Sequence, residues 1–191
     1  MTRAGIVALG SLLLAGCAQM TSSGATGPSA SADLRNAAGQ SVGRATLTTA
    51  GTGVRVVLDL RGLPPGGKGV HIHEIGKCEP PAFTSAGAHF NPGKRQHGMD
   101  NPQGPHAGDL PNVTIAADGT GRLDTTTDRA SLAAGGPTSL FDADGSALVV
   151  HADADDMKTD PTGGSGGRIA CGVIVPPASS SGGRPTAVPG Y

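Results

Sequence analysis

Short stretches rich in β-branched residues recur along this chain, and residues that favour turns separate them. No stretch shows the sustained 3.6-residue apolar period of an amphipathic helix. The candidate strands cover residues 31–37, 42–48, 54–60, 69–73, 112–116, 121–126, 146–151 and 168–174. The chain has 32 glycines, which favour turns, and only 2% aromatic residues, so Val, Ile, Leu and Ala must build the core. Eight short strands predict an all-β fold, an antiparallel sandwich or barrel.

The connections between the candidate strands are of two kinds. Short turns are expected at residues 64–67, 118–119 and 144–145, where Gly follows Pro or Asp. Two longer segments, Glu74–Leu110 and Ala152–Gly167, carry no strand pattern. Long loops without secondary structure in a compact domain are usually functional or disordered. A metal site or a disulfide would explain order in the first of them, which contains Cys78 and three histidines.

The composition divides the chain into four segments, one of which is a folded domain. Residues 1–16 combine a positively charged start with a short apolar run, as an export signal does. Residues 17–31 are rich in Ser, Gly, Thr and Ala and are expected to form a flexible tether. The folded domain is expected over residues 32–175, and the Pro-, Gly- and Ser-rich residues 176–191 are expected to be disordered.

Cys17 lies directly after the export signal. The segment Leu14-Ala15-Gly16-Cys17 resembles the lipobox of bacterial lipoproteins, in which the cysteine is lipidated and becomes the first residue. The alternative is an ordinary secretory signal followed by an incidental cysteine. The lipobox predicts a lipid anchor on Cys17 and a location on a membrane of the bacterial cell envelope, facing the periplasm or the exterior.

The net charge and the two remaining cysteines bear on the partners of the protein and on its covalent structure. The net charge is −1, and there is no basic run or aromatic platform, so we expect no nucleic-acid partner. Cys78 and Cys171 form an even pair in an exported chain, which predicts a disulfide. Such a bridge would close a loop of about 94 residues and stabilise the fold by roughly 4–5 kcal/mol.

Six histidines form the most informative pattern of side chains. His71 and His73 are two residues apart on a candidate strand, so their imidazoles share a face and suit one metal ion, although two incidental histidines would look the same. Three more histidines, His89, His97 and His106, lie in the long loop, and Asp109 follows three residues after His106. Three His and one Asp are a ligand set that Zn²⁺ accepts, whereas a merely solvated loop is the alternative.

These motifs together resemble the copper/zinc superoxide dismutase family. The resemblance is carried, in the family's order, by Val70-His71-Ile72-His73-Glu74, Gly87-Ala88-His89-Phe90-Asn91-Pro92, His106-Ala107-Gly108-Asp109-Leu110, Val149-Val150-His151-Ala152 and Arg168-Ile169-Ala170-Cys171-Gly172-Val173-Ile174. It covers residues 32–175 and uses all six histidines. It implies an eight-stranded antiparallel Greek-key β-barrel or sandwich with two long functional loops.

The resemblance also implies two metal ions in each chain. The copper ligands would be His71, His73, His89 and His151. The zinc ligands would be His89, His97, His106 and Asp109. His89 belongs to both sets and would bridge the two ions. Copper would alternate between Cu(II) and Cu(I), and zinc would be structural.

The implied activity is an antioxidant one: two superoxide anions and two protons give dioxygen and hydrogen peroxide. Arg168 matches the arginine that attracts the anion, and His89 would supply a proton. Asp155 matches the carboxylate that links His71 to His97, although the adjacent Asp156 is an alternative. Cys78 and Cys171 match the family disulfide.

Other functions remain open from the sequence. The same ligands could store copper or zinc in the envelope with little or no dismutase activity, and a copper-only enzyme is a further alternative. Retention of every ligand and of Arg168 favours the enzyme. The resemblance allows either a monomer or a homodimer.

Overall fold

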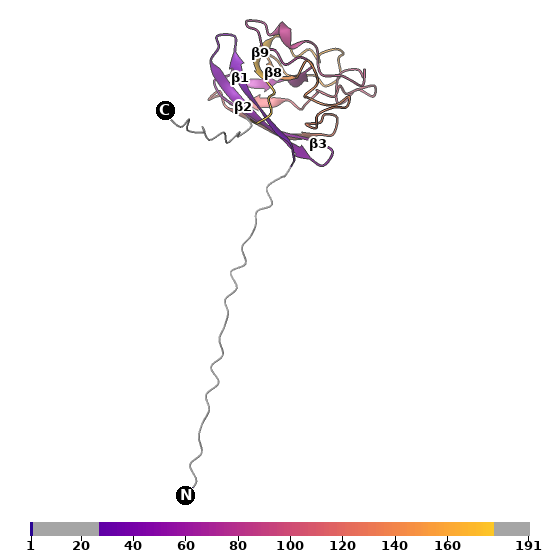
Figure 1. Cartoon of the computed structure of the whole chain (residues 1–191). Helices are drawn as coiled ribbons and strands as arrows, with labels where there is room; N and C mark the ends of the chain where they lie inside the picture. The colour runs from indigo at the N-terminus through magenta and orange to yellow at the C-terminus, as the bar shows by residue number, and fades with distance from the viewer. Residues whose placement is uncertain (2–26, 178–191) are drawn as a thin grey trace, which may run out of the picture.

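The computed structural model describes Met1 and residues 27–177 (Figure 1). Residues 2–26 lie outside the described residues, and they include Cys17, all of the predicted export signal except Met1 and most of the predicted tether. Residues 178–191 of the predicted C-terminal tail lie outside them too. Among the described residues, no helix is long and apolar enough to cross a membrane.

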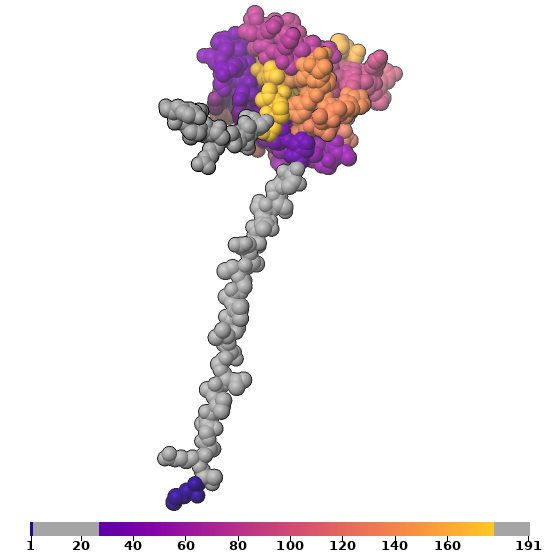
Figure 2. Space-filling view, in the orientation of Figure 1, coloured from indigo at the N-terminus to yellow at the C-terminus, as the bar shows by residue number. Residues whose placement is uncertain are grey.

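The described residues form nine β-strands and one short 3-10 helix, which confirms the predicted all-β class. The strands are β1 (Ser29–Asn36), β2 (Ser41–Ala50), β3 (Gly53–Leu60), β4 (Gly66–Lys68), β5 (Val70–His73), β6 (Val113–Ile115), β7 (Gly121–Thr127), β8 (Ala147–His151) and β9 (Arg168–Val173), and the helix is η1 (Thr84–Ala86). Seven of the strands form one antiparallel sheet in the order β5-β8-β9-β1-β2-β3-β7. The last strand therefore pairs with the first, and in Figure 2 the yellow end of the chain lies between the indigo strands and the orange segment.

Alternation of buried and exposed residues places the core inside the curved sheet. In β3, Val54, Val56 and Leu58 are fully buried, whereas Arg55 and Asp59 face solvent. This period of two is the pattern of a strand with one wet face. Strand β8 differs, because all five of its residues are buried. Phe83 and Ala86, from the first long loop, pack against Ala147 and Val149 of β8. His71 and His73 of β5 lie opposite these two β8 residues.

One turn prediction was wrong. Residues 64–67 were expected to form a turn, but Gly66 and Gly67 begin β4, which pairs with β6 in a separate two-stranded sheet. The expectation rested on composition alone. Glycine backbone groups hydrogen-bond in a ladder like those of any residue, and Gly66 also adopts a φ of 113°, which side-chain-bearing residues rarely adopt.

Candidate metal centre

Two neighbouring strands carry three of the histidines to one place. Strand β5 pairs with β8 so that His71 lies opposite Val149 and His73 opposite Ala147, while His151 ends β8. The long loop adds His89, which forms an isolated bridge with His73. None of the six histidines is more than 6% exposed. Buried imidazole nitrogens need hydrogen-bond partners or ligands. The nitrogens that have no partner in the protein therefore show where this centre can bind a ligand.

Four imidazoles converge with one nitrogen of each left free of protein carbonyl or carboxylate partners. The Nδ1 of His73 donates to the Gly87 carbonyl (3.0 Å), and the Nδ1 of His151 donates to the Gly166 carbonyl (3.2 Å). Their Nε2 atoms lie 3.4 Å apart.

The other two imidazoles leave buried nitrogens without any partner. The Nδ1 of His71 and the Nε2 of His89 are both buried and unbonded. One ligand atom from each of His71, His73, His89 and His151 lies within 4.8 Å of the others. Two buried nitrogens with no partner among four clustered imidazoles fit a metal ion, and an all-imidazole set suits Cu(II).

A second group surrounds the opposite nitrogen of His89. Its Nδ1 lies 3.0 Å from the Asp109 Oδ1, and the His97 Nδ1 is 3.0 Å from the same oxygen. The His106 Nδ1 lies 3.4 Å from both the His89 Nδ1 and the Asp109 Oδ1. Tetrahedral zinc with bonds of about 2.0–2.1 Å needs ligand atoms about 3.3 Å apart, and these four distances lie close to that value.

His71 also comes within 4.8 Å of His89, His97 and Asp109. Its ring stacks on that of His89, with 3.9 Å between centroids, which explains the proximity. We nevertheless assign it to the first group, because its Nε2 donates to Asp155 (2.8 Å) and only its Nδ1 remains free.

Asp155 joins the two groups from outside. Its carboxylate accepts from His71 Nε2 (2.8 Å) and from His97 Nε2 at 3.0 Å. Asp156, the alternative from the sequence, instead accepts backbone N–H groups of Lys158 and Thr159 in an exposed turn. Asp155 thus fixes the orientation of one imidazole in each group, as carboxylates beside metal-binding histidines commonly do.

Burial and hydrogen bonding set the protonation of the centre. Burial lowers the pKa of His73 to about 2, of His151 to about 3 and of His89 to about 4, and neighbouring imidazoles add to the effect. These rings are therefore neutral near pH 7, as metal ligands must be. Burial also acts to lower the pKa of His97, but hydrogen bonds to Asp109 and Asp155 outweigh it and raise that pKa to about 9.

The metal-free protein should be most stable near pH 7. Below that value the unfolded chain protonates His73, His89 and His151 before the folded chain does, so each ring costs up to about 1.4 kcal/mol per pH unit. Above it, the contribution of protonated His97 is lost as pH rises towards about 9. Urea unfolding of the metal-free chain at pH 5.0, 7.0 and 9.0 measures this, and equal stability at pH 5.0 and 7.0 would contradict it.

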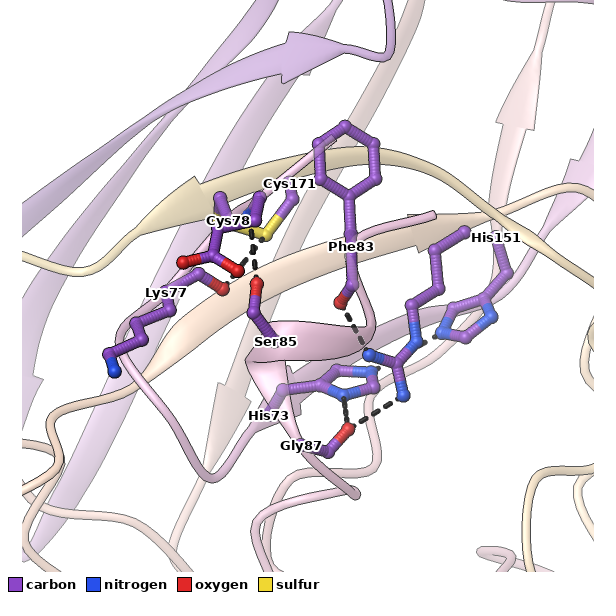
Figure 3. Close-up of a disulfide and its surroundings, with 10 residues drawn as sticks. His73, Lys77, Cys78, Phe83, Ser85, Gly87, His151 and Cys171 are labelled. Carbon is purple, nitrogen blue, oxygen red and sulfur yellow. Dashed lines mark hydrogen bonds between the residues drawn. A yellow bond between two sulfur atoms is a disulfide. The ribbon is translucent and has the colours of Figure 1, made fainter. Parts of the chain in front are cut away.

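Arg168 begins β9 beside the first group, and backbone carbonyls hold its guanidinium. Nη1 donates to the Phe83 carbonyl and Nη2 to the Gly87 carbonyl, both at 2.6 Å. The Gly87 carbonyl also accepts from His73 (Figure 3), so one oxygen orients the side chains of both His73 and Arg168. Burial lowers the pKa of Arg168 somewhat, but arginine remains charged in proteins. Arg168 and His89 line the same cleft, together with Arg95, Glu74 and Asp160.

The predicted disulfide between Cys78 and Cys171 is present, with 5.6 Å between the Cα atoms. It ties the long loop to β9 (Figure 3), at a position three residues after Arg168 in the sequence. Phe83 packs beside it in a small buried cluster with Ala86 and Val149. The bridge and this cluster therefore hold the carbonyls that orient Arg168.

Sequence reasoning missed several supporting residues. The carbonyls of Phe83 and Gly87 could come from any residue type, so no side-chain signal marks them. Asp160 accepts the backbone N–H of His97 at 2.6 Å and fastens the second long loop to the first. Arg129 donates to the carbonyls of His106 and Asp109.

A curled antiparallel β-sheet beside two adjacent groups of side chains that could bind metal, with His89 in both groups, is an arrangement suited to a dinuclear metal centre. The chain matches the model of the family described as copper/zinc superoxide dismutase (SODC) over residues 41–174. It is 46% identical to Cu-Zn superoxide dismutase 1 of Aquifex aeolicus over 144 residues, 75% of this chain and 85% of that protein.

Two further comparisons agree. The Cu-Zn superoxide dismutase of Caulobacter vibrioides is 47% identical over 148 residues, 76% of this chain and 85% of that protein. The crystal structure of a SOD-like protein from Bacillus subtilis superposes with a TM-score of 0.73 at 40% identity, covering 76% of this chain and 97% of that one. The chain belongs to the copper/zinc superoxide dismutase family.

Proposed function

We propose that this chain is a superoxide dismutase that holds one copper and one zinc ion and converts two superoxide anions and two protons to dioxygen and hydrogen peroxide. The observation that carries the proposal is the convergence of four imidazoles in which His71 Nδ1 and His89 Nε2 are buried without a partner. Its position beside a carbonyl-held arginine supports the same function. The relatives that bear the name superoxide dismutase support it too.

Each group is assigned one metal. We assign copper to His71, His73, His89 and His151, whose free nitrogens form the first group. We assign zinc to His89, His97, His106 and Asp109, which form the second. When bound, copper would supply one-electron chemistry by alternating between Cu(II) and Cu(I), and zinc would supply a fixed charge without redox chemistry.

The protein's own groups would bind the anion and move protons. Arg168 places a positive charge in the cleft that leads to His89, and such focusing raises the local concentration and the association rate of a small anion. One superoxide gives up an electron and leaves as dioxygen. The other accepts an electron and two protons, and the Nε2 of His89 would hold and deliver one of them only when it is not bound to copper.

Replacing Arg168 with glutamine should lower kcat/KM by about 10-fold or more and flatten its dependence on ionic strength, because steering by charge typically contributes 10–10³ to an association rate. Arg168→Lys keeps the charge but loses the hydrogen bonds to two carbonyls, so its kcat/KM should lie between those of the wild type and the glutamine variant. Stopped-flow dismutation at several salt concentrations measures this. A glutamine variant with an unchanged rate and an unchanged salt slope would contradict the steering role.

Metal storage without dismutation is the second candidate. A relative from Bacillus subtilis, 44% identical over 124 residues, bears the name superoxide dismutase-like protein, so relatives of this similarity do not all carry the plain dismutase name. Storage needs the ligands but has no use for a fixed arginine in the cleft. Metal content and dismutation measured on the same preparation separate the two candidates.

We also propose that the chain is exported and anchored by a lipid on Cys17, with residues 1–16 removed as a signal, residues 17–28 as the tether and 176–191 as a tail. The tether was predicted to reach residue 31, but Ser29–Ser31 begin β1 and pair with β2. The disulfide supports export, because such bridges persist in oxidising compartments. Metabolic labelling with palmitate tests the anchor. Wild-type protein should carry the label in the membrane fraction, and Cys17→Ala should not. An unlabelled wild-type protein would contradict it.

A further inference from the structure

Arg129, the second residue after β7, is fixed beside the main hydrophobic core. Its backbone N–H donates to the Thr127 hydroxyl at 3.2 Å. Ala130 and Leu132, which follow it, are almost completely buried in the main core. The starting point of the Arg129 side chain is therefore set by the barrel and is independent of the long loop that it reaches.

The guanidinium of Arg129 spans the turn that carries two of the residues assigned to zinc. Nε donates to the His106 carbonyl at 3.3 Å and Nη2 to the Asp109 carbonyl at 3.0 Å. These two carbonyls belong to the first and last residues of one turn. A planar guanidinium holds its donors at a fixed separation, whereas a lysine offers its donors from a single point.

The same turn is fixed on its inner side by Asp109 itself. The Asp109 Oδ2 accepts the backbone N–H groups of His106 and Gly98, both at 2.9 Å. This leaves Oδ1 facing the imidazoles of His89 and His97. Arg129 closes the turn from outside, so the backbone that presents His106 and Asp109 has bonds on both sides.

We propose that Arg129 is a positioning residue for the zinc-directed group, acting through the backbone of His106 and Asp109. The proposal rests on the zinc assignment made above. Charge alone predicts the opposite effect, because a guanidinium near a cation site repels the cation. Any gain in zinc affinity from Arg129 therefore comes from geometry, and the sign of the change in a variant separates the two explanations.

The test uses the full chain with Arg129→Lys, which keeps the charge but loses the planar pair of donors, and Arg129→Gln, which loses both. Arg122→Lys and Arg122→Gln are matched controls, because Arg122 is an exposed residue of β7 paired with Asp59. Zinc and copper affinities are measured by competition with chelators. The visible spectrum of Co²⁺, bound in place of zinc, reports the geometry of the ligands.

We expect both Arg129 variants to bind zinc about 10–100-fold more weakly, the range seen when partners of metal ligands are lost. Copper affinity should stay within about threefold, the cobalt spectrum should change, and the Arg122 variants should match the wild type. Unchanged zinc affinity, tighter zinc binding by Arg129→Gln, or an equal loss for both metals would each overturn the proposal. A wild-type chain that takes up no zinc overturns the zinc assignment itself, a failure visible before any substitution is made.

Discussion

Replacing His151 with alanine should remove copper and superoxide dismutation together while zinc stays near one ion per chain. His151 offers its Nε2 to the first group and no atom to the second, so only the copper-directed set loses a ligand. Loss of a group that merely supports a ligand costs 10–100-fold in affinity or activity, so loss of a ligand itself should cost more than about 100-fold. Metal analysis and a dismutation assay on one preparation measure both effects.

Arg55→Ala is the control for that experiment, because Arg55 pairs with Asp124 on the exposed face of the sheet. It should keep both metals and full activity. A His151→Ala variant that retains copper and dismutes superoxide at the wild-type rate would contradict the copper assignment. Loss of zinc as well as copper would show that removing His151 disturbs both groups of residues and not the copper-directed group alone.

Removing the disulfide, by Cys78→Ser together with Cys171→Ser, should lower the free energy of unfolding of the metal-free protein by about 4–5 kcal/mol. The bridge joins residues 93 apart, and loop closure of that length restricts the unfolded chain by this amount in the chain-entropy model. Dismutation should fall too, because the freed loop carries the carbonyls that hold Arg168. Urea unfolding at pH 6.5 measures the stability.

Cys17→Ser is the matched control, since it removes the remaining cysteine without touching the bridge. It should leave the unfolding transition of the domain unchanged. A loss below about 1 kcal/mol in the double variant would contradict the role given to the disulfide.

The strands were predictable because their signal is local. In β3 the alternation of apolar residues with Arg55 and Asp59 specifies both the extended conformation and the buried face. Strand β4 was missed for the same reason: its Gly66 and Gly67 have no side chains to alternate, and its formation depends on pairing with β6. The paths of the two long loops also follow from tertiary contacts, such as the bond from the His97 N–H to Asp160, that no local pattern encodes.

The residues of the candidate site were predictable, but which nitrogen of each histidine is free to bind a metal was not. The spacing of His71 and His73 places them on one face of a strand, and the family resemblance supplied the remaining ligands and Arg168. Which nitrogen of each ring is free depends on the carbonyls of Gly87 and Gly166 and on Asp155, which are distant in sequence from the rings that they orient. Arg129 was missed because an arginine at a strand end resembles any surface residue.

The most direct test of the proposed function is superoxide dismutation by the purified chain after loading with copper and zinc, with both metals counted in the same sample. We predict one copper and one zinc per chain and rapid dismutation that disappears when copper alone is removed by a chelator. One copper and one zinc per chain with no dismutation would contradict the proposed enzyme and leave a metal-binding protein of the same fold.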